Sequence, residues 1–154
     1  MTDPRVTGAA VIGLGDIRGT DAGRVGPKMA RLGQLAADGW RVPDGYAVTE
    51  IRGFPAAKGT VEGTARVITT VGDLHLVQPG EILVCGGTTT EWTPAFGIIT
   101  ACVCDTGGSL THAAIVSREY GIPCVVGTAI ATQVVKTGDR IRVDGRAGTV
   151  QVLA

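Results

Sequence analysis

Residues 106–112 read Thr106-Gly107-Gly108-Ser109-Leu110-Thr111-His112, a glycine-rich loop that ends in a histidine. The run Gly97–Cys104 before this loop is continuously apolar and of strand length, which predicts a strand buried on both faces. The residues after it, Thr111–Tyr120, predict a helix, which Gly121 stops just before Pro123. The sequence thus predicts a unit of strand, glycine-rich loop and helix, with His112 in the first turn of the helix.

This unit has the features of a phosphate site. Gly107 and Gly108 let backbone N–H groups approach an anion, and the start of a helix adds unpaired N–H groups with a partial positive charge. A histidine with its ordinary pKa of about 6.5 is largely the neutral nucleophile at pH 7. A phosphoryl group on His112 could be held by the loop amides and by the hydroxyls of Ser109 or Thr111. Spacing alone leaves a second interpretation open, in which Thr111 is an ordinary N-cap and His112 a first-turn residue.

The composition predicts one globular domain with a tail. The chain has 154 residues, of which 44% are apolar and 18% charged, and its 14 basic residues balance its 14 acidic ones. The charges form no basic run, so nucleic-acid or membrane-surface binding is not expected. No apolar run approaches the roughly 20 residues that cross a bilayer, and no signal pattern opens the chain. We expect a cytoplasmic protein.

The chain divides at about residue 53. Residues 1–53 are rich in glycine and contain a helical pattern over Lys28–Ala37, which Gly39 ends, and a short strand over Tyr46–Val48. Residues 54–154 predict short strands and helices of a mixed α/β domain. The strands expected there are Ala65–Ile68, Glu81–Cys85, Cys124–Val126, Ile141–Val143 and Val150–Leu153, and a polar loop is expected over Thr88–Pro94.

The four cysteines, Cys85, Cys102, Cys104 and Cys124, each lie in an apolar stretch. Reduced, buried thiols are therefore the favoured interpretation, with a metal site and a redox pair as rivals. The spacing Cys102-x-Cys104 is shorter than the usual C-x₂₋₄-C of zinc sites, so no metal ligands are predicted.

Other polar and aromatic residues are expected to have structural roles. Arg118 lies six residues after His112, so on a regular helix it points away from the histidine. Asp105 is expected to position the loop, and His75 to be a solvated surface residue. For Trp92, packing and contact with a partner remain equally open.

The run from Thr106 to Gly127 strongly resembles the swivelling, or mobile, domain of phosphoenolpyruvate-utilising enzymes. That family includes phosphoenolpyruvate synthase, pyruvate phosphate dikinase, rifampicin phosphotransferase and phenylphosphate synthase. The resemblance covers residues 56–153, including Trp92-Thr93-Pro94, Gly138-Asp139 and Val143-Asp144-Gly145. It implies an α/β fold, the swivelling β/β/α phosphohistidine domain, here preceded by a short N-terminal arm.

In that family the histidine matching His112 is phosphorylated on a ring nitrogen. The resemblance implies that Gly107, Gly108 and Ser109 shape the phosphate loop and that Thr111 orients or bonds the imidazole. It further implies a phosphocarrier that receives its phosphoryl group from ATP or phosphoenolpyruvate through a partner. The acceptor would be a small alcohol, a phenol or pyruvate. The rival hypotheses are a non-catalytic docking or regulatory module and a thiol-based role.

The N-terminal arm, residues 1–53, resembles the opening of the family's ATP-grasp domain. Lys28 matches a lysine that contacts nucleotide phosphate in a V-G-G-K segment, but here Pro27 replaces the second glycine and removes an N–H group. So short an arm cannot form a nucleotide site, so the expected partner is a separately encoded ATP-grasp or acceptor-binding subunit. ATP and Mg²⁺ are expected at that partner, and no cofactor is expected on this chain.

Overall fold

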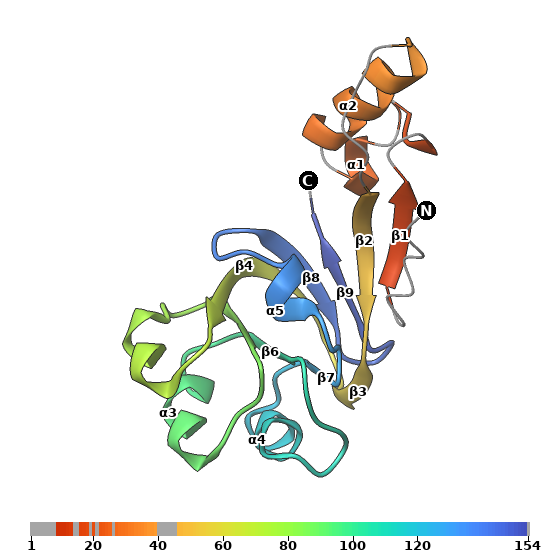
Figure 1. Ribbon diagram of the computed structural model, residues 1–154. Helices are drawn as coiled ribbons and strands as arrows, with labels where there is room; N and C mark the ends of the chain where they lie inside the picture. Colours follow the sequence, from red (N-terminus) through yellow and green to blue (C-terminus); the bar gives the residue numbers. More distant parts are fainter. Residues whose placement is uncertain are drawn as a thin grey trace.

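A computed structural model describes residues 9–13, 16–18, 20, 22–25, 27–39 and 46–153 of the chain. The run Val42-Pro43-Asp44-Gly45, whose composition is typical of a turn, lies outside these ranges. Nine strands form one sheet in the order β1-β2-β9-β8-β4-β5-β6-β7-β3. Helices α3 and α4 lie together at one end of the molecule, and α1 and α2 lie at the other (Figure 1).

One half of the sheet is mainly parallel. Its parallel strands are β4 (Thr60–Ile68), β5 (Ile82–Cys85), β6 (Ala101–Cys104) and β7 (Cys124–Val126), and β3 (Phe54–Ala57) pairs antiparallel with β7. Every residue of β5, β6 and β7 is buried, as continuous apolar strands covered on both faces require. The carboxyl ends of β5 and β6 therefore lie side by side, and the loops that leave them meet.

Short helices cover the two faces of this half. On one face lie the 3₁₀ segments η3 (Val71–Leu76) and η4 (Thr90–Trp92), with α3 (Thr93–Phe96) and α4 (His112–Tyr120). The other face is covered by α5 (Ala131–Val134). Two apolar cores result, and the first one, beneath α3 and α4, contains all four cysteines.

The antiparallel half completes the sheet. The first part of β4 pairs with β8 (Arg140–Asp144), and β8 pairs in turn with β9 (Thr149–Val152). Beyond them lie β2 (Tyr46–Arg52) and β1 (Ala9–Gly13). Because β4 pairs with β8 and then with β5, it joins the two halves.

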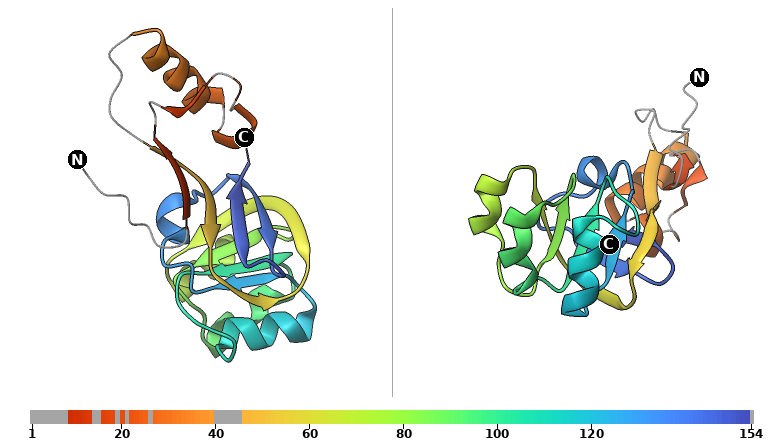
Figure 2. Two further views of the ribbon diagram at one scale, coloured as in Figure 1. Left: turned by 90° about the vertical axis from the view of Figure 1, so that its right-hand side faces the viewer. Right: turned by 90° about the horizontal axis from the view of Figure 1, so that it is seen from below.

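The N-terminal arm contributes α1 (Ala22–Val25) and α2 (Pro27–Ala37), which confirms the helix expected over Lys28–Ala37. Ile17 is fully buried there, against a small set of apolar residues from the arm. Helices α1 and α2 lie away from the body of the molecule (Figure 2). The strand that follows them, β2, joins the main sheet, since Ile51 pairs with Val150. The domain boundary at residue 53 stays a prediction.

Two local predictions were wrong. The strand expected over Gly97–Cys104 begins only at Ala101, because α3 ends in a turn where the N–H groups of Ile98 and Ile99 both donate to the carbonyl of Ala95. The polar loop expected over Thr88–Pro94 contains η4 and the start of α3, since proline is well suited to a first helical turn. A short apolar run such as Ile98-Ile99 is compatible with a strand and with a buried turn, so its pattern does not distinguish the two.

Candidate phosphohistidine site

His112 is the first residue of α4, at the carboxyl edge of the parallel strands. The chain leaves β6 after Cys104, crosses the glycine-rich loop and enters the helix with Thr111 in extended conformation at the N-cap. Gly121 ends the helix in left-handed conformation, with φ of 67°. The predicted unit of strand, loop and helix is therefore present, and its histidine is half-buried.

Both ring nitrogens of His112 have threonine partners. The Nδ1 atom lies 2.9 Å from the hydroxyl oxygen of Thr88, and the Nε2 atom lies 3.2 Å from that of Thr93. Phe96 packs edge-on against the imidazole, with the ring centroids 5.9 Å apart and the planes at 81°. The ring is thus held in place by two hydrogen bonds and one aromatic contact.

The hydrogen bonds of Thr93 determine which ring nitrogen carries the proton. Its hydroxyl donates to the carbonyl of Thr90 at 2.7 Å, and a hydroxyl has only one proton to give. It must therefore accept from Nε2–H of His112, which leaves Nδ1 to accept from the hydroxyl of Thr88. Thr88 makes no second hydrogen bond within the described part of the chain, so its hydroxyl can turn and accept instead.

The glycine-rich loop leaves the start of α4 open. Gly107 adopts φ of +116°, and a Cβ there would lie 2.9 Å from the hydroxyl oxygen of Thr111, so the loop path requires glycine. A Cβ on Gly108 would meet no atom within 4 Å. Among the described residues, the N–H groups of His112, Ala113 and Ala114 have no hydrogen-bond partner. These groups can bind an anion at the helix start.

Thr111 does not contact the imidazole through its hydroxyl, which donates to the carbonyl of Gly108 at 2.8 Å. The hydroxyl does not cap the helix N–H groups. It also does not bond the ring of His112, which was one of the two roles that the resemblance implied for Thr111. The residues that hold the ring are Thr88 and Thr93. Ser109 is exposed on the loop, where its carbonyl accepts a hydrogen bond.

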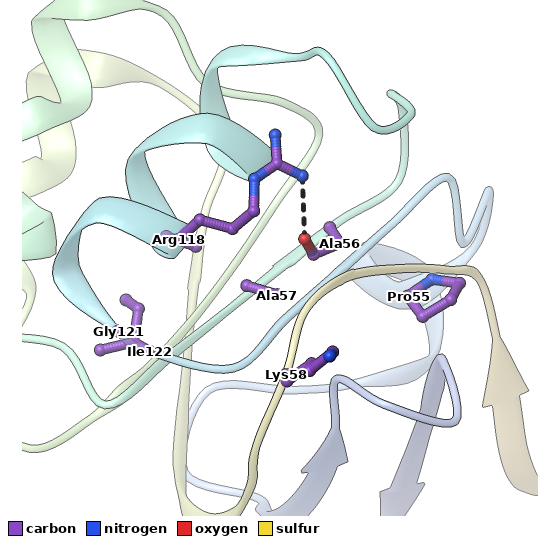
Figure 3. A pocket seen from close by; sticks show the side chains of 8 residues that line it. Pro55, Ala56, Ala57, Lys58, Arg118, Gly121 and Ile122 are labelled. Atoms are coloured by element: carbon purple, nitrogen blue, oxygen red, sulfur yellow. Dashed lines mark hydrogen bonds between the residues drawn. The ribbon is translucent and has the colours of Figure 1, made fainter.

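Arg118 ties the helix to two other segments. Its guanidinium donates to the carbonyl of Ser109 at 2.7 Å. It also donates to the carbonyl of Ala56 on β3 at 3.1 Å (Figure 3). This confirms the structural role expected from its distance along the helix from His112. Arg118 also lines a surface pocket of about 360 Å³ between β3 and the end of α4.

Asp105 anchors the other end of the loop, as expected. Its carboxylate accepts hydrogen bonds from the hydroxyl of Thr128 at 3.0 Å, from the backbone N–H of Thr132 at 3.2 Å and from the Thr132 hydroxyl. These bonds attach the loop to the start of α5.

Trp92 is buried in the core, so its role is packing. His75 is exposed, as predicted.

The sequence did not predict that Thr88 and Thr93 contact His112, since it placed them only in a polar loop. Their contact with the histidine could have been inferred from the order of the parallel strands. They follow β5, while His112 follows β6, and loops that leave adjacent parallel strands meet at one edge of the sheet.

Lys28, the proposed nucleotide contact, is a residue of α2, and its side chain lies outside the described part of the structure. Helices α2 and α4 lie at opposite ends of the molecule (Figure 2). The arrangement therefore does not bring this residue to the His112 site.

No helix in the described ranges is both long and apolar enough to cross a membrane.

Comparisons with known proteins identify the domain. Residues 77–148 match the sequence profile of the family described as PEP-utilising enzyme, mobile domain. These residues belong to that family. Rifampicin phosphotransferase of Bacillus cereus is 48% identical to this chain over 103 residues, which are 67% of this chain and 12% of that protein. The probable phosphoenolpyruvate synthase of Methanothermobacter thermautotrophicus is 42% identical over 100 residues, 65% of this chain and 15% of that protein.

The chain thus spans about an eighth of the length of these relatives, which are much larger proteins. Among solved structures, aconitase X of Thermococcus kodakaraensis in its holo-form has a TM-score of 0.52 and 21% identity to this chain. The match covers 68% of this chain and 98% of the other. At this identity the likeness concerns the α/β fold alone, and it agrees with the fold expected of the mobile domain.

Proposed function

We propose that the mobile domain is a phosphocarrier in which His112 accepts a phosphoryl group and passes it to a second substrate. The observation that carries this proposal is the pair of threonine hydroxyls on the two ring nitrogens of His112, beside helix N–H groups without partners. A ring held by hydrogen bonds is pre-oriented for in-line attack, which lowers the entropic cost of reaching the transition state.

The Nε2 atom is the proposed nucleophile. Its bond to Thr93, at 3.2 Å, is longer than the 2.9 Å bond from Nδ1 to Thr88. Nε2 is also the ring nitrogen farther from the backbone, so a donor can reach it once Thr93 moves aside. For the attack the proton must sit on Nδ1, and the Thr88 hydroxyl can accept the hydrogen bond from Nδ1–H because it has no other partner in the described residues.

The transfer replaces a P–O bond of the donor by a P–N bond to Nε2, and the donor leaves with the bonding electron pair. Free N–H groups at the start of α4 and in the loop would stabilise the negative charge on the phosphoryl oxygens. The second transfer reverses these steps, with an acceptor oxygen as the attacking atom. Splitting one transfer into two is the general advantage of a covalent intermediate.

Donor and acceptor sites lie outside this domain in the proposal. A nucleotide-binding module of the ATP-grasp type would supply the phosphoryl group with its Mg²⁺, and an acceptor module would bind an alcohol, a phenol or pyruvate. The far greater length of the relatives is consistent with such modules. The proposed compartment is the cytoplasm, where ATP and phosphoenolpyruvate are available.

Label transfer tests the proposal. The chain and its His112→Ala variant are incubated with host extract and with labelled ATP or phosphoenolpyruvate. We expect label that is acid-labile and base-stable, on the wild type alone. Absence of label from both donors, in an extract that supports the complete reaction, would favour the rival docking module.

A further inference from the structure

The strands bring together cysteines that are far apart in sequence. Cys85 on β5 pairs in register with Cys104 on β6, and Cys102 lies two residues earlier on the same face of β6. The sulfur of Cys104 lies 3.6 Å from that of Cys85 and 3.7 Å from that of Cys102. All three residues are fully buried, and their sulfurs lie within 4.8 Å of one another.

We propose that Cys85, Cys102 and Cys104 form a three-thiolate site for a soft metal ion, with Cu(I) as the preferred ion. A triangle with edges of 3.6 and 3.7 Å and a third edge of at most 4.8 Å has a circumscribed radius of at most about 2.4 Å. An ion at its centre would therefore lie close to the metal–sulfur distance of about 2.3 Å found for thiolates. The sulfurs are already spaced for three-coordinate binding without movement of the strands.

The number of ligands favours Cu(I) over Zn²⁺. Structural zinc almost always takes four ligands in a tetrahedron, whereas thiolates select Cu(I) by softness and three of them satisfy it. The fourth cysteine, Cys124 on β7, pairs with Cys102 on β6 but lies outside the group of three sulfurs. Its thiol donates instead toward the carbonyl of Ala113, 3.9 Å away.

Binding of the ion would displace thiol protons, because the thiolate is the form that binds a metal. A thiolate in an apolar core is costly unless positive charge lies close to it, and the ion would place positive charge beside the three sulfurs.

The site also has a short entry route. Cys85 and Cys104 are the last residues of their strands, so both lie at the carboxyl edge of the sheet, next to Gly86 and Asp105. An ion entering there passes the exposed Gly86 and not the centre of the core. Among the described residues, the ring of His112 is not part of this group of ligands, so replacing that histidine should leave metal binding unchanged.

The test is a titration of the reduced chain with Cu(I) in the absence of oxygen. A chelator that forms a coloured complex with Cu(I) competes for the ion, and Zn²⁺ is titrated in a separate experiment. We expect one Cu(I) per chain, with near-ultraviolet absorbance from thiolate-to-metal charge transfer. Cys104→Ser should weaken retention at least tenfold because Cys104 contacts both other sulfurs, while Cys124→Ser and His112→Ala should retain the ion. Circular dichroism of each variant checks that it is folded.

A second measurement needs no variant. The folded wild type, with and without one equivalent of Cu(I), is incubated with a small alkylating reagent, and modification of each cysteine is followed over time by mass spectrometry. Protection of Cys85, Cys102 and Cys104, with Cys124 modified, supports the site. Absence of stoichiometric Cu(I), equal protection of all four cysteines, or binding of Zn²⁺ alone would overturn it.

Discussion

The hydroxyl oxygen of Thr88 lies 2.9 Å from Nδ1 of His112, and the two residues lie in segments that follow the neighbouring parallel strands β5 and β6. Because this hydroxyl can donate to or accept from Nδ1, it serves either tautomer of the ring. Thr93 lacks this freedom, since its proton is given to the carbonyl of Thr90. Thr88 therefore allows His112 to present Nε2 as a nucleophile without losing its orientation.

Replacing Thr88 by valine should slow phosphorylation of His112. Valine keeps the shape and removes the hydrogen bond to Nδ1, and the loss of about 1–1.5 kcal/mol corresponds to a rate about tenfold lower. Thr88→Ser keeps the hydroxyl and should stay within about twofold of the wild type. The measurement is the initial rate of label incorporation with the productive donor. Equal rates for the valine and serine variants would show that the hydroxyl has no part in the transfer.

Phosphorylation should occur on Nε2 of His112. The longer bond to Thr93 and the position of Nε2 away from the backbone both favour it over Nδ1, which Thr88 holds. Nuclear magnetic resonance of the phosphorylated chain, with ¹⁵N-labelled histidine and detection of the ³¹P–¹⁵N coupling, distinguishes the two isomers. A phosphoryl group on Nδ1 would mean that Thr88, and not Thr93, moves aside during the reaction.

The two loop glycines should differ in their response to alanine. At Gly107 a side chain meets both the φ of +116° and the close contact with Thr111, so Gly107→Ala should destabilise the fold by at least about 1 kcal/mol. At Gly108 the space is open, so Gly108→Ala should change the free energy of unfolding by less than about 0.5 kcal/mol. Urea denaturation measures both. If the two variants lose equal stability, the loop path described here is incorrect.

The sequence predicted the elements around His112 better than it predicted the contacts of its ring. Local signals, such as the glycines of the loop and Gly121 after the helix, determine where α4 begins and ends, and these predictions were confirmed. The contacts from Thr88 and Thr93 depend on which strands are neighbours, which periodicity does not reveal. The same is true of the cysteines, because Cys85 meets Cys104 only through the order of the strands.

Glu81 should make the stability of the fold sensitive to acid. Arg66 donates two hydrogen bonds to this nearly buried carboxylate, at 2.9 and 2.7 Å, and they are the main reason that the pKa of Glu81 lies below its ordinary value. A carboxyl group whose pKa is lower in the folded state stabilises the fold above its unfolded pKa. That stabilisation is lost as the pH falls from about 4.5 through the folded pKa.

The variant Glu81→Gln should be less stable than the wild type at pH 7, because Arg66 would lose its charged partner. Its free energy of unfolding should also fall less steeply between about pH 5 and 3. Some dependence on pH should remain, since backbone N–H groups of Ala147 and Arg146 lower the pKa of Asp144 as well. Glu62→Gln, which alters an exposed ion pair with Arg142, is the matched control and should change little at pH 7. Chemical denaturation at several pH values gives the slopes, and parallel curves for Glu81→Gln and the wild type would exclude Glu81 as a source of acid sensitivity.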